Sequence, residues 1–319
     1  MLILLQNIDV RPMCKVCFVA YLIALFFMGC SGSNNPLVIT EEDSSKSSHD
    51  SLSIDIAKLN CRVFLLDSSQ HYRGLTVDHS IVFVTGSKGH VAQGLLSTDS
   101  IKWRVHCNVD SLHLRDIEVV SDSIFVLSIG APGFIKSISK SKITDDRSLW
   151  NTTYFNSDSN VFMDGFSFWD NGYGLTYGDP LNEFHFLLKT KNYGKEWIRI
   201  DSIQLPKPAM EEAGFAASGT GLACIGDGVA FVGWGGVKAR IFKTIDYGES
   251  WCVQETPIAH GKAGKGIYCM AWKNQLEGVV AGGNWEEPAG DSCYAYTKDG
   301  GETWKLGIGG SGYRSGICH

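Results

Sequence analysis

The sequence predicts an all-β protein, a β-propeller made of four-stranded antiparallel blades. Its composition favours short strands joined by tight turns, because Gly is abundant (36 residues), Pro is scarce (8) and aromatic residues make up 11% of the chain. Tryptophan returns at intervals of 47, 47, 54 and 53 residues, at Trp103, Trp150, Trp197, Trp251 and Trp304. A period of ~50 residues with four short apolar runs in each repeat is typical of propeller blades.

Each repeat begins with an apolar run that we expect to form the first strand of a blade. These runs are YRGLTV (72–77), LRDIEVV (114–120), MDGFSFW (163–169), AGFAASG (213–219) and IYCMAWK (267–273). The second strands are expected in IVFVTG, IFVLSIG, GYGLTYGDP, VAFVGWGG and GVVAGGN, the third in HFLLKT, RIFKTI and CYAYTK, and the fourth in WIRIDSI and WCVQETP. A β-sandwich that happens to share this spacing is the alternative. A helical solenoid is excluded, because no apolar period of about 3.6 residues occurs.

A polar turn of the form T-x-D-x-G-x-x-W joins the third and fourth strands. An Asp at its third position can accept backbone N–H groups inside the turn, and Gly supplies the positive φ that a tight hairpin requires. The Trp then buries its ring over the hairpin. We predict a structural role for three such turns, one of which has Asn in place of Asp; two earlier copies, STDSIKW and SKITDDRSLW, are eroded. The residues of the three turns are Asn192, Gly194 and Trp197; Asp246, Gly248 and Trp251; and Asp299, Gly301 and Trp304.

The N-terminus is predicted to be an export signal. Lys15 precedes the apolar run VCFVAYLIALFFMG, which is short for a membrane span of ~20 residues, and the tetrapeptide FMGC resembles a bacterial lipobox. We therefore expect residues 1–29 to be a lipoprotein signal peptide and Cys30 to carry the lipid. An uncleaved anchor or an ordinary signal peptide is the alternative. Residues 30–58 are Ser-rich and are expected to form a flexible tether, followed by the propeller over residues 59–319. These features place the protein in the bacterial cell envelope, on the periplasmic face or the cell surface.

The polar turns resemble the Asp-box, or BNR, repeat found in sialidases and many other propellers. Over residues 60–319 the chain is also similar to exported bacterial propellers of the photosystem II stability/assembly-factor family. The segments that carry this resemblance are HYRGLTV, LRDIEVVSDSIFVLSIGAPG, FSFWDNGYGLTYGDP, EEAGFAASGTGL, GGVKARIFKT and GYRSGI. The resemblance implies a seven-bladed propeller that acts by binding. The sequence departs from it, because it holds five complete blades and GYRSGICH only begins a sixth; we therefore expect a propeller that is incomplete at its C-terminus.

A candidate binding site is expected at one mouth of the channel, where the loops that enter the first strands gather. Arg73, Arg115 and Arg314 occupy that entrance in the first, second and sixth repeats. Loops after the second strands bring acidic and aromatic residues to the same face: Asp179, Trp234, Trp285 and Glu286. We expect the two Trp residues to be exposed and the surface to suit an acidic peptide terminus or a small anionic ligand. The alternative is that each Arg pairs with a carboxylate of a neighbouring blade and only lines the channel.

The charge and the missing motifs narrow the function further. A net charge of −6, from 28 Lys and Arg against 34 Asp and Glu, argues against nucleic acid as the main partner. No C-x-x-C pair follows the signal, the His residues show no metal spacing and no G-x-S-x-G motif occurs, so neither a cofactor nor a metal is expected. We predict a non-catalytic, lipid-anchored envelope scaffold or assembly factor that binds a protein or peptide. The alternative is a sialidase-like glycoside hydrolase that uses the channel-mouth arginines, although the R-I-P motif and a placed Tyr/Glu pair are missing.

Overall fold

The predicted fold class is confirmed. The computed structural model describes residues 2–5, 19–21, 61–64, 66, 70–97, 100–143, 146–308 and 312–317. Within them, five four-stranded antiparallel sheets follow one another along the chain. The helical turns of this part are short 3-10 segments: η2 (Ser87–Gly89), η3 (Lys140–Lys142), η4 (Arg147–Leu149) and η5 (Ser202–Gln204). Over the same residues, no helix has the length and apolar character that a membrane crossing requires.

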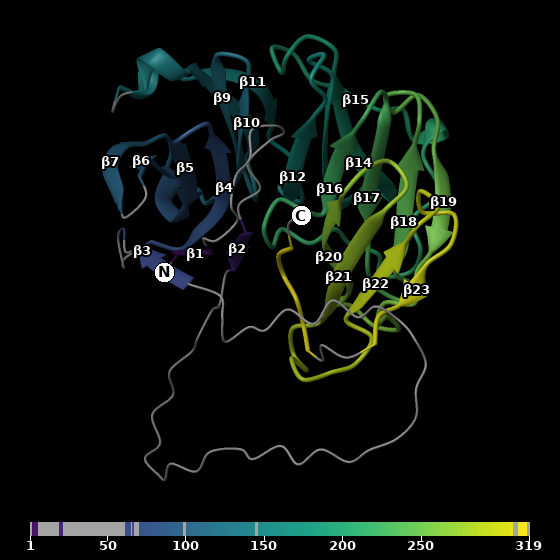
Figure 1. The fold of residues 1–319 in the computed structure, drawn as a ribbon. Helices are drawn as coiled ribbons and strands as arrows, with labels where there is room; N and C mark the ends of the chain where they lie inside the picture. The colour runs from purple at the N-terminus through teal and green to yellow at the C-terminus, as the bar shows by residue number, and fades with distance from the viewer. Residues whose placement is uncertain are drawn as a thin grey trace, which may run out of the picture.

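The strands of each blade pair in chain order, so that every blade is an up-and-down meander (Figure 1). Blade 1 comprises β4 (Tyr72–Asp78), β5 (Ile81–Gly86), β6 (His90–Leu96) and β7 (Ile101–Asn108). Blade 2 comprises β8 (Leu114–Val120), β9 (Ser123–Ser128), β10 (Gly133–Ser139) and β11 (Asn151–Asn156). Blade 3 comprises β12 (Met163–Phe168), β13 (Gly174–Leu181), β14 (Phe184–Thr190) and β15 (Ile198–Arg199). Blade 4 comprises β16 (Leu222–Ile225), β17 (Val229–Gly233), β18 (Arg240–Thr244) and β19 (Cys252–Glu255). Blade 5 comprises β20 (Lys265–Trp272), β21 (Gly278–Asn284), β22 (Tyr294–Thr297) and β23 (Lys305–Leu306).

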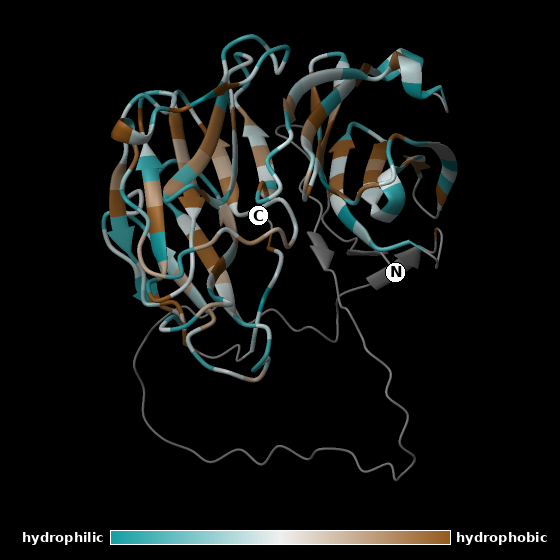
Figure 2. Cartoon of the chain, turned by 180° about the vertical axis from the view of Figure 1, so that it is seen from behind, coloured by the Kyte–Doolittle hydropathy of each residue, from teal (hydrophilic) through white to brown (hydrophobic). Residues whose placement is uncertain are grey.

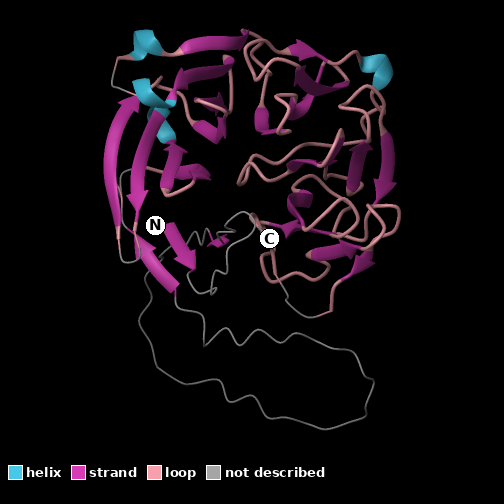
Figure 3. Ribbon diagram, turned by 45° about the horizontal axis from the view of Figure 1, so that its top comes forward, coloured by secondary structure: helices cyan, strands magenta, loops and turns pink. Residues whose placement is uncertain are grey.

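The blades are arranged around a common axis (Figure 3). The first strands contact one another in chain order, β4 with β8, β8 with β12, β12 with β16 and β16 with β20, so these inner strands line the axis. A turn between strands three and four lies at the same end of a meander as the turn between strands one and two. The Asp-box turns therefore lie at the end of the axis opposite to the start of the inner strands.

The hydrophobic core lies in the seams between neighbouring blades. Successive residues of a strand point to opposite faces, so each strand supplies side chains to two seams. In β9, Ile124 packs toward blade 1 and Phe125 toward blade 3. The second strands therefore read as apolar runs, for example IVFVTG in β5 and VAFVG in β17, and brown bands cross the sheets in Figure 2. Each large side chain buried in a seam stabilises the fold by about 1.5–3 kcal/mol.

A separate sheet of three short antiparallel strands precedes the blades. Its order is β2-β1-β3, with β1 at Leu2–Leu5, β2 at Val19–Tyr21 and β3 at Cys61–Phe64. The first two of these strands fall within the predicted signal peptide, residues 1–29. Cys30 and the predicted tether, residues 30–58, lie outside the described residues, so the lipid anchor and the tether stay predictions.

The prediction for the first strand of blade 4 is wrong. The run at 213–219 is a loop in which Ala213 forms an isolated bridge with Gly235, and the inner strand is β16 instead. Two glycines explain the loop, because both approach acidic side chains of other blades. A Cβ on Gly214 would lie 2.1 Å from Asp164 Oδ2, and Gly219 has a φ of +75° beside Asp116. The loop therefore reaches over to the inner strands of blades 2 and 3.

The segment expected to begin a sixth blade does not form a strand in residues 312–317. It turns back onto blade 5, where the Arg314 N–H donates to Gly282 O at 2.8 Å and the Tyr313 N–H donates to Pro288 O at 2.8 Å. The structure thus shows five blades, and the seven implied by the family resemblance are not among the described residues.

Candidate functional site

Four of the five inner strands carry a β-bulge near their start. The pairing register shifts between Tyr72 and Gly74, Leu114 and Asp116, Met163 and Gly165, and Ile267 and Cys269. The residues left unpaired are Arg73, Arg115, Asp164 and Tyr268. A bulge bends the strand and re-aims the side chain of its extra residue. The four side chains therefore share one structural position at the mouth of the channel.

Arg73 and Arg115 lie close enough for the charge of one to act on the other. Burial and, to a smaller extent, the positive charge of Arg73 lower the pKa of Arg115 to about 10, and the negative charge of Asp164 partly opposes them. The Nε of Arg115 is buried without a hydrogen-bond partner. Among the described residues, neither guanidinium forms an ion pair or a side-chain hydrogen bond. The alternative expectation is that each Arg pairs with a carboxylate of the next blade; within the described residues no such ion pair forms at 4.0 Å or less, although the charge of Asp164 on blade 3 acts on Arg115.

Two carboxyl groups lie next to this cationic pair. Asp164 is fully buried, and both of its oxygens are without a hydrogen-bond partner. Burial raises its pKa well above the usual range; the negative charge of Asp179 adds to this shift and Arg115 opposes it. Asp179 is half-buried and accepts the Gly214 N–H at 3.0 Å, and burial raises its pKa to about 6. Both carboxyl groups are therefore harder to ionise than an exposed Asp side chain.

Two further acids of β8 lie deeper along the inner strand. The Asp116 carboxylate joins blades 2 and 3, because its oxygens accept the N–H groups of Ile117 and Phe166, both at 2.9 Å. Glu118 accepts the Thr76 hydroxyl of blade 1 at 3.3 Å, and burial raises its pKa to about 7. We assign both carboxyl groups to the contact between inner strands.

Aromatic side chains close the mouth on the side of blade 5. The ring of Tyr268 stacks on Phe215, with centroids 3.9 Å apart, and meets the edge of Tyr313 at 4.8 Å. Burial raises the pKa of Tyr313 to about 12, and the charge of Arg73 opposes this rise, which places Tyr313 near blade 1. The segment that follows blade 5 therefore brings Tyr313 within electrostatic range of Arg73.

The remaining predicted mouth residues divide into two groups. Trp285 is 59% exposed, as expected, and Glu286 is also on the surface, where its carboxylate lies 3.4 Å from Lys262 Nζ. Arg314 instead donates from its Nη1 to two carbonyls of its own turn, those of Gly312 and Tyr313. Within the described residues, no hydrogen bond or ion pair joins Trp285 or Glu286 to the two bulged arginines.

The expectation that Trp234 is exposed is wrong. Its side chain is fully buried in the seam between blades 3 and 4, where its ring lies 4.2 Å from that of His185 and 5.4 Å from that of Phe242. The neighbouring Glu212 carboxylate is buried too and is held by Arg240 and by His185, whose Nε2 lies 3.1 Å away. Trp234 follows β17 directly, and the strand alternation turns it into the seam.

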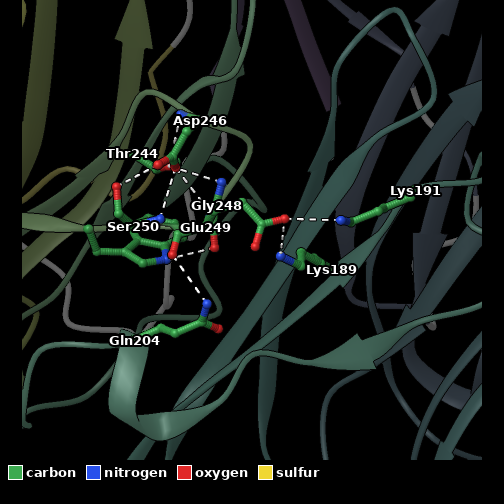
Figure 4. Close-up of polar contacts among 9 residues, drawn as sticks. Lys189, Lys191, Gln204, Thr244, Asp246, Gly248, Glu249 and Ser250 are labelled. Carbon is green, nitrogen blue, oxygen red and sulfur yellow. Dashed lines mark hydrogen bonds and ion pairs between the residues drawn. The ribbon is translucent and has the colours of Figure 1, made fainter.

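The Asp-box turns have the geometry that the sequence predicts. Asp246 Oδ1 accepts the Thr244 hydroxyl at 2.8 Å and the N–H groups of Glu249 and Ser250 at 3.0 and 2.9 Å, while Gly248 has a φ of +82° (Figure 4). Asp299 repeats this pattern with Thr297 and Thr303. Asn192 accepts the Thr190 hydroxyl and the Glu196 N–H, both at 3.0 Å. The three turns are hydrogen-bonded hairpins.

Each Asp-box Gly also packs on the preceding blade. A Cβ added to Gly194, Gly248 or Gly301 would lie 2.6 Å from Phe125, 3.2 Å from Leu175 or 3.1 Å from Phe231, respectively. The turn of one blade therefore covers the second strand of the blade before it. A left-handed Gly is needed here both for its φ and for this close approach.

Comparison with known proteins supports the fold. No protein-family model matches the chain, and no curated protein matches it in sequence. Among solved structures, the chain is similar to one described as YCF48 bound to D1 peptide, with 15% identity, a TM-score of 0.50, and coverage of 78% of this chain and 72% of the other. It is also similar to a chain of a mitotic checkpoint complex, with 9% identity, a TM-score of 0.54, and coverage of 83% and 72%. At such low identity these similarities show a shared β-propeller fold.

Proposed function

We propose that this propeller is a non-catalytic scaffold that binds an acidic segment of a partner protein or peptide at the channel mouth. The observation that carries the proposal is the pair of bulged arginines, Arg73 and Arg115, which lie close to each other without an ion-pair partner among the described residues. Two neighbouring cations repel each other, and a carboxylate placed between them removes that repulsion. Guanidinium groups hold carboxylates through paired, directional hydrogen bonds.

The surroundings of the two arginines favour a peptide over a small inorganic anion. Stacked aromatic rings, Phe215, Tyr268 and Tyr313, lie on one side of the mouth, where they can contact apolar parts of a peptide. The solved YCF48 structure contains a D1 peptide, so a propeller of similar fold can hold a peptide. The sequence resemblance to the photosystem II assembly-factor family also supports a binding role. A shared fold does not identify the partner.

A binding role is also favoured over glycoside hydrolysis. A Tyr nucleophile needs a general base within hydrogen-bond reach or a lowered pKa. The Tyr268 hydroxyl donates to a carbonyl, Gly264 O, at 2.8 Å, and burial raises its pKa. This hydroxyl is a structural donor, which is the opposite of an activated nucleophile.

The cellular place of this scaffold is proposed from the N-terminal sequence. Cys30 follows the lipobox-like Phe27-Met28-Gly29, so we place the protein on the bacterial cell envelope, held by a lipid on Cys30. The Ser-rich residues 30–58 then separate the propeller from the membrane. A partner is accordingly sought among envelope proteins.

The test is a titration of the full chain with a fluorescent heptapeptide of alternating glutamate and leucine that ends in a free carboxylate. We expect saturable binding that weakens with salt and drops at least tenfold in Arg73→Gln and in Arg115→Gln. The matched control is Arg104→Gln, an exposed Arg on the outer strand of blade 1. Equal affinity for wild type and all three variants would contradict the proposal, as would the absence of saturable binding to wild type.

A further inference from the structure

On the Asp-box face, the seam between blades 2 and 3 differs from the next two seams in its charged residues. An ion pair crosses each of those two seams: Lys189 Nζ lies 2.7 Å from Glu249 Oε1, and Lys243 Nζ lies 2.8 Å from Glu302 Oε1. In both, the Lys is on the third strand of one blade and the Glu follows the Asp-box Gly of the next blade. Figure 4 shows the Lys189–Glu249 pair beside the Asp246 turn. The repeat thus places a cation and an anion at fixed positions.

The equivalent positions of the seam between blades 2 and 3 hold Ser137 and Lys195. Ser137 pairs with Phe125 across β10 and β9, just as Lys189 pairs with Leu175 and Lys243 with Phe231 in the next blades. Lys195 follows Gly194, at the position of the Glu. The seam has therefore lost the carboxylate, and its ammonium group now comes from the opposite side.

A groove of about 510 Å³ occupies this seam. Its volume lies within the range of about 300–1,000 Å³ that is typical of small-molecule sites. The two neighbouring seams carry a long Lys side chain where this one carries the short Ser137, and the difference leaves room. The lining residues that matter here are Ser121, Ser123, Ser137, Thr152, Tyr193 and Lys195.

The polar groups of this groove are available to a ligand. Within the described part of the chain, the hydroxyls of Ser121, Ser123, Ser137 and Thr152 form no hydrogen bond, and the Lys195 ammonium has no acidic partner. A hydroxyl can both donate and accept, so the lining suits a ligand that itself carries several hydroxyl groups.

Two further side chains add chemical specificity. Asp122 lies at the rim, where it accepts the Ser139 hydroxyl at 2.9 Å, and it can accept hydroxyl donors from a ligand as well. Tyr193 is 45% exposed and its ring rests against Gly172, so it offers an amphipathic aromatic surface. A ring with an apolar C–H face and hydroxyl edges matches this combination.

We propose that this groove binds a carboxylated sugar, a hexuronic acid unit. The sugar carboxylate supplies the negative charge that this seam lacks and pairs with Lys195. The ring hydroxyls bond to the free Ser and Thr hydroxyls and to Asp122, and the C–H face packs on Tyr193. The site lies on the Asp-box face, at the opposite end of the axis from Arg73 and Arg115, so it is independent of the proposed peptide site.

The test is an NMR titration of the full chain with methyl β-glucuronide. We expect saturable binding, with methyl β-glucoside, which lacks the carboxylate, at least tenfold weaker. Lys195→Gln is expected to weaken glucuronide binding at least tenfold. Ser137→Lys combined with Lys195→Glu is expected to abolish binding, because this double change rebuilds the ion pair of the next two seams. Lys305→Gln, on an exposed outer strand, is the matched control.

Three outcomes overturn the proposal. The first is no saturable binding of the glucuronide to wild type. The second is equal binding of the glucuronide and the glucoside, with no effect of Lys195→Gln. The third is binding that is lost in Arg73→Gln and Arg115→Gln instead, which would place the carboxylate at the channel mouth. A melting curve of the double variant that matches wild type ensures that its loss of binding reports the filled groove.

Discussion

Arg73 and Arg115 occupy the same bulged position on adjacent inner strands, and the positive charge of Arg73 contributes to lowering the pKa of Arg115 to about 10. A base whose folded pKa is lowered costs stability while it is charged. The protein therefore holds two cations together at a cost to the fold. Such an arrangement is expected of a binding site and not of a structural strut.

If the two arginines form a binding site, replacing Arg115 should weaken peptide binding without destabilising the fold. Arg115→Gln is expected to leave the melting temperature unchanged or to raise the unfolding free energy by about 1 kcal/mol, because it removes a buried charge and a like-charge contact. The same variant is expected to lose peptide affinity. A thermal melting curve measures the effect on stability, and the peptide titration measures the effect on affinity. A clear fall in melting temperature with unchanged affinity would identify Arg115 as a strut of the channel.

The pKa of Glu118 predicts a pH dependence near neutrality. Its folded pKa is about 7, above the ordinary value of 4.5, mainly because of burial. A carboxyl group with a raised folded pKa destabilises the fold when it is ionised. The free energy of unfolding is therefore expected to fall as the pH rises from about 4.5 to about 7. Above that pH, the ionised Glu118 lowers the free energy of unfolding by at most about 3 kcal/mol. Glu118→Gln is expected to flatten this fall. Melting curves of both proteins between pH 4.5 and pH 8 test it, and parallel curves would contradict the assignment.

The Asp-box turns are expected to matter for stability alone. Asp246→Ala removes four hydrogen bonds in blade 4, three to Asp246 Oδ1 and one to Oδ2, which contribute about 0.5–1.5 kcal/mol each before relaxation. Urea unfolding should therefore show a loss of about 1–3 kcal/mol, with peptide and glucuronide binding retained in the cold. Asp227→Ala, in the exposed first hairpin of the same blade, is the control and should be close to neutral. Lost binding without lost stability would show that the turn is functional.

The lipid anchor is tested in the host cell. Metabolic labelling with an alkyne analogue of palmitate is expected to mark the wild-type chain and to leave Cys30→Ala unlabelled, because the lipobox-like FMGC directs the lipid to that thiol. Cys14→Ala, earlier in the signal, is the matched control and should still be labelled. Equal labelling of Cys30→Ala and wild type would remove the proposed anchor.

The repeat could be predicted from the sequence because its signals are local. The Trp spacing, the turn residues and the apolar runs recur in each blade, and the hairpins around Gly194, Gly248 and Gly301 form as their sequences indicate. The sequence predicts a strand at the blade-4 loop because the apolar residues of this loop alternate as strand residues do. What distinguishes it is the close approach of Gly214 to Asp164, a contact between repeats.

The candidate sites could be predicted only in part, for the same reason. Arg73 and Arg115 can be found from the sequence because they occupy the same place in two repeats. Asp164 and Tyr268 occupy the equivalent bulged position in blades 3 and 5, but only the strand pairing shows this. Trp234 follows a strand, and the face to which it points depends on the neighbouring blade. Ser137 and Lys195 likewise stand where the next seams have a Lys and a Glu, and their proximity across the seam is known only when two blades are packed together.

The central claim is that Arg73 and Arg115 together hold the carboxylate of an acidic peptide. It is tested most directly by NMR of the arginine side-chain Nε–H signals of the full chain, assigned with single Arg→Gln variants, during titration with the glutamate–leucine heptapeptide. We predict that the Arg73 and Arg115 signals shift together and saturate at one concentration, while the Arg104 signal stays in place. Amidation of the peptide C-terminus should weaken the response. Saturable binding that shifts other arginines and leaves these two unchanged would contradict the proposed site.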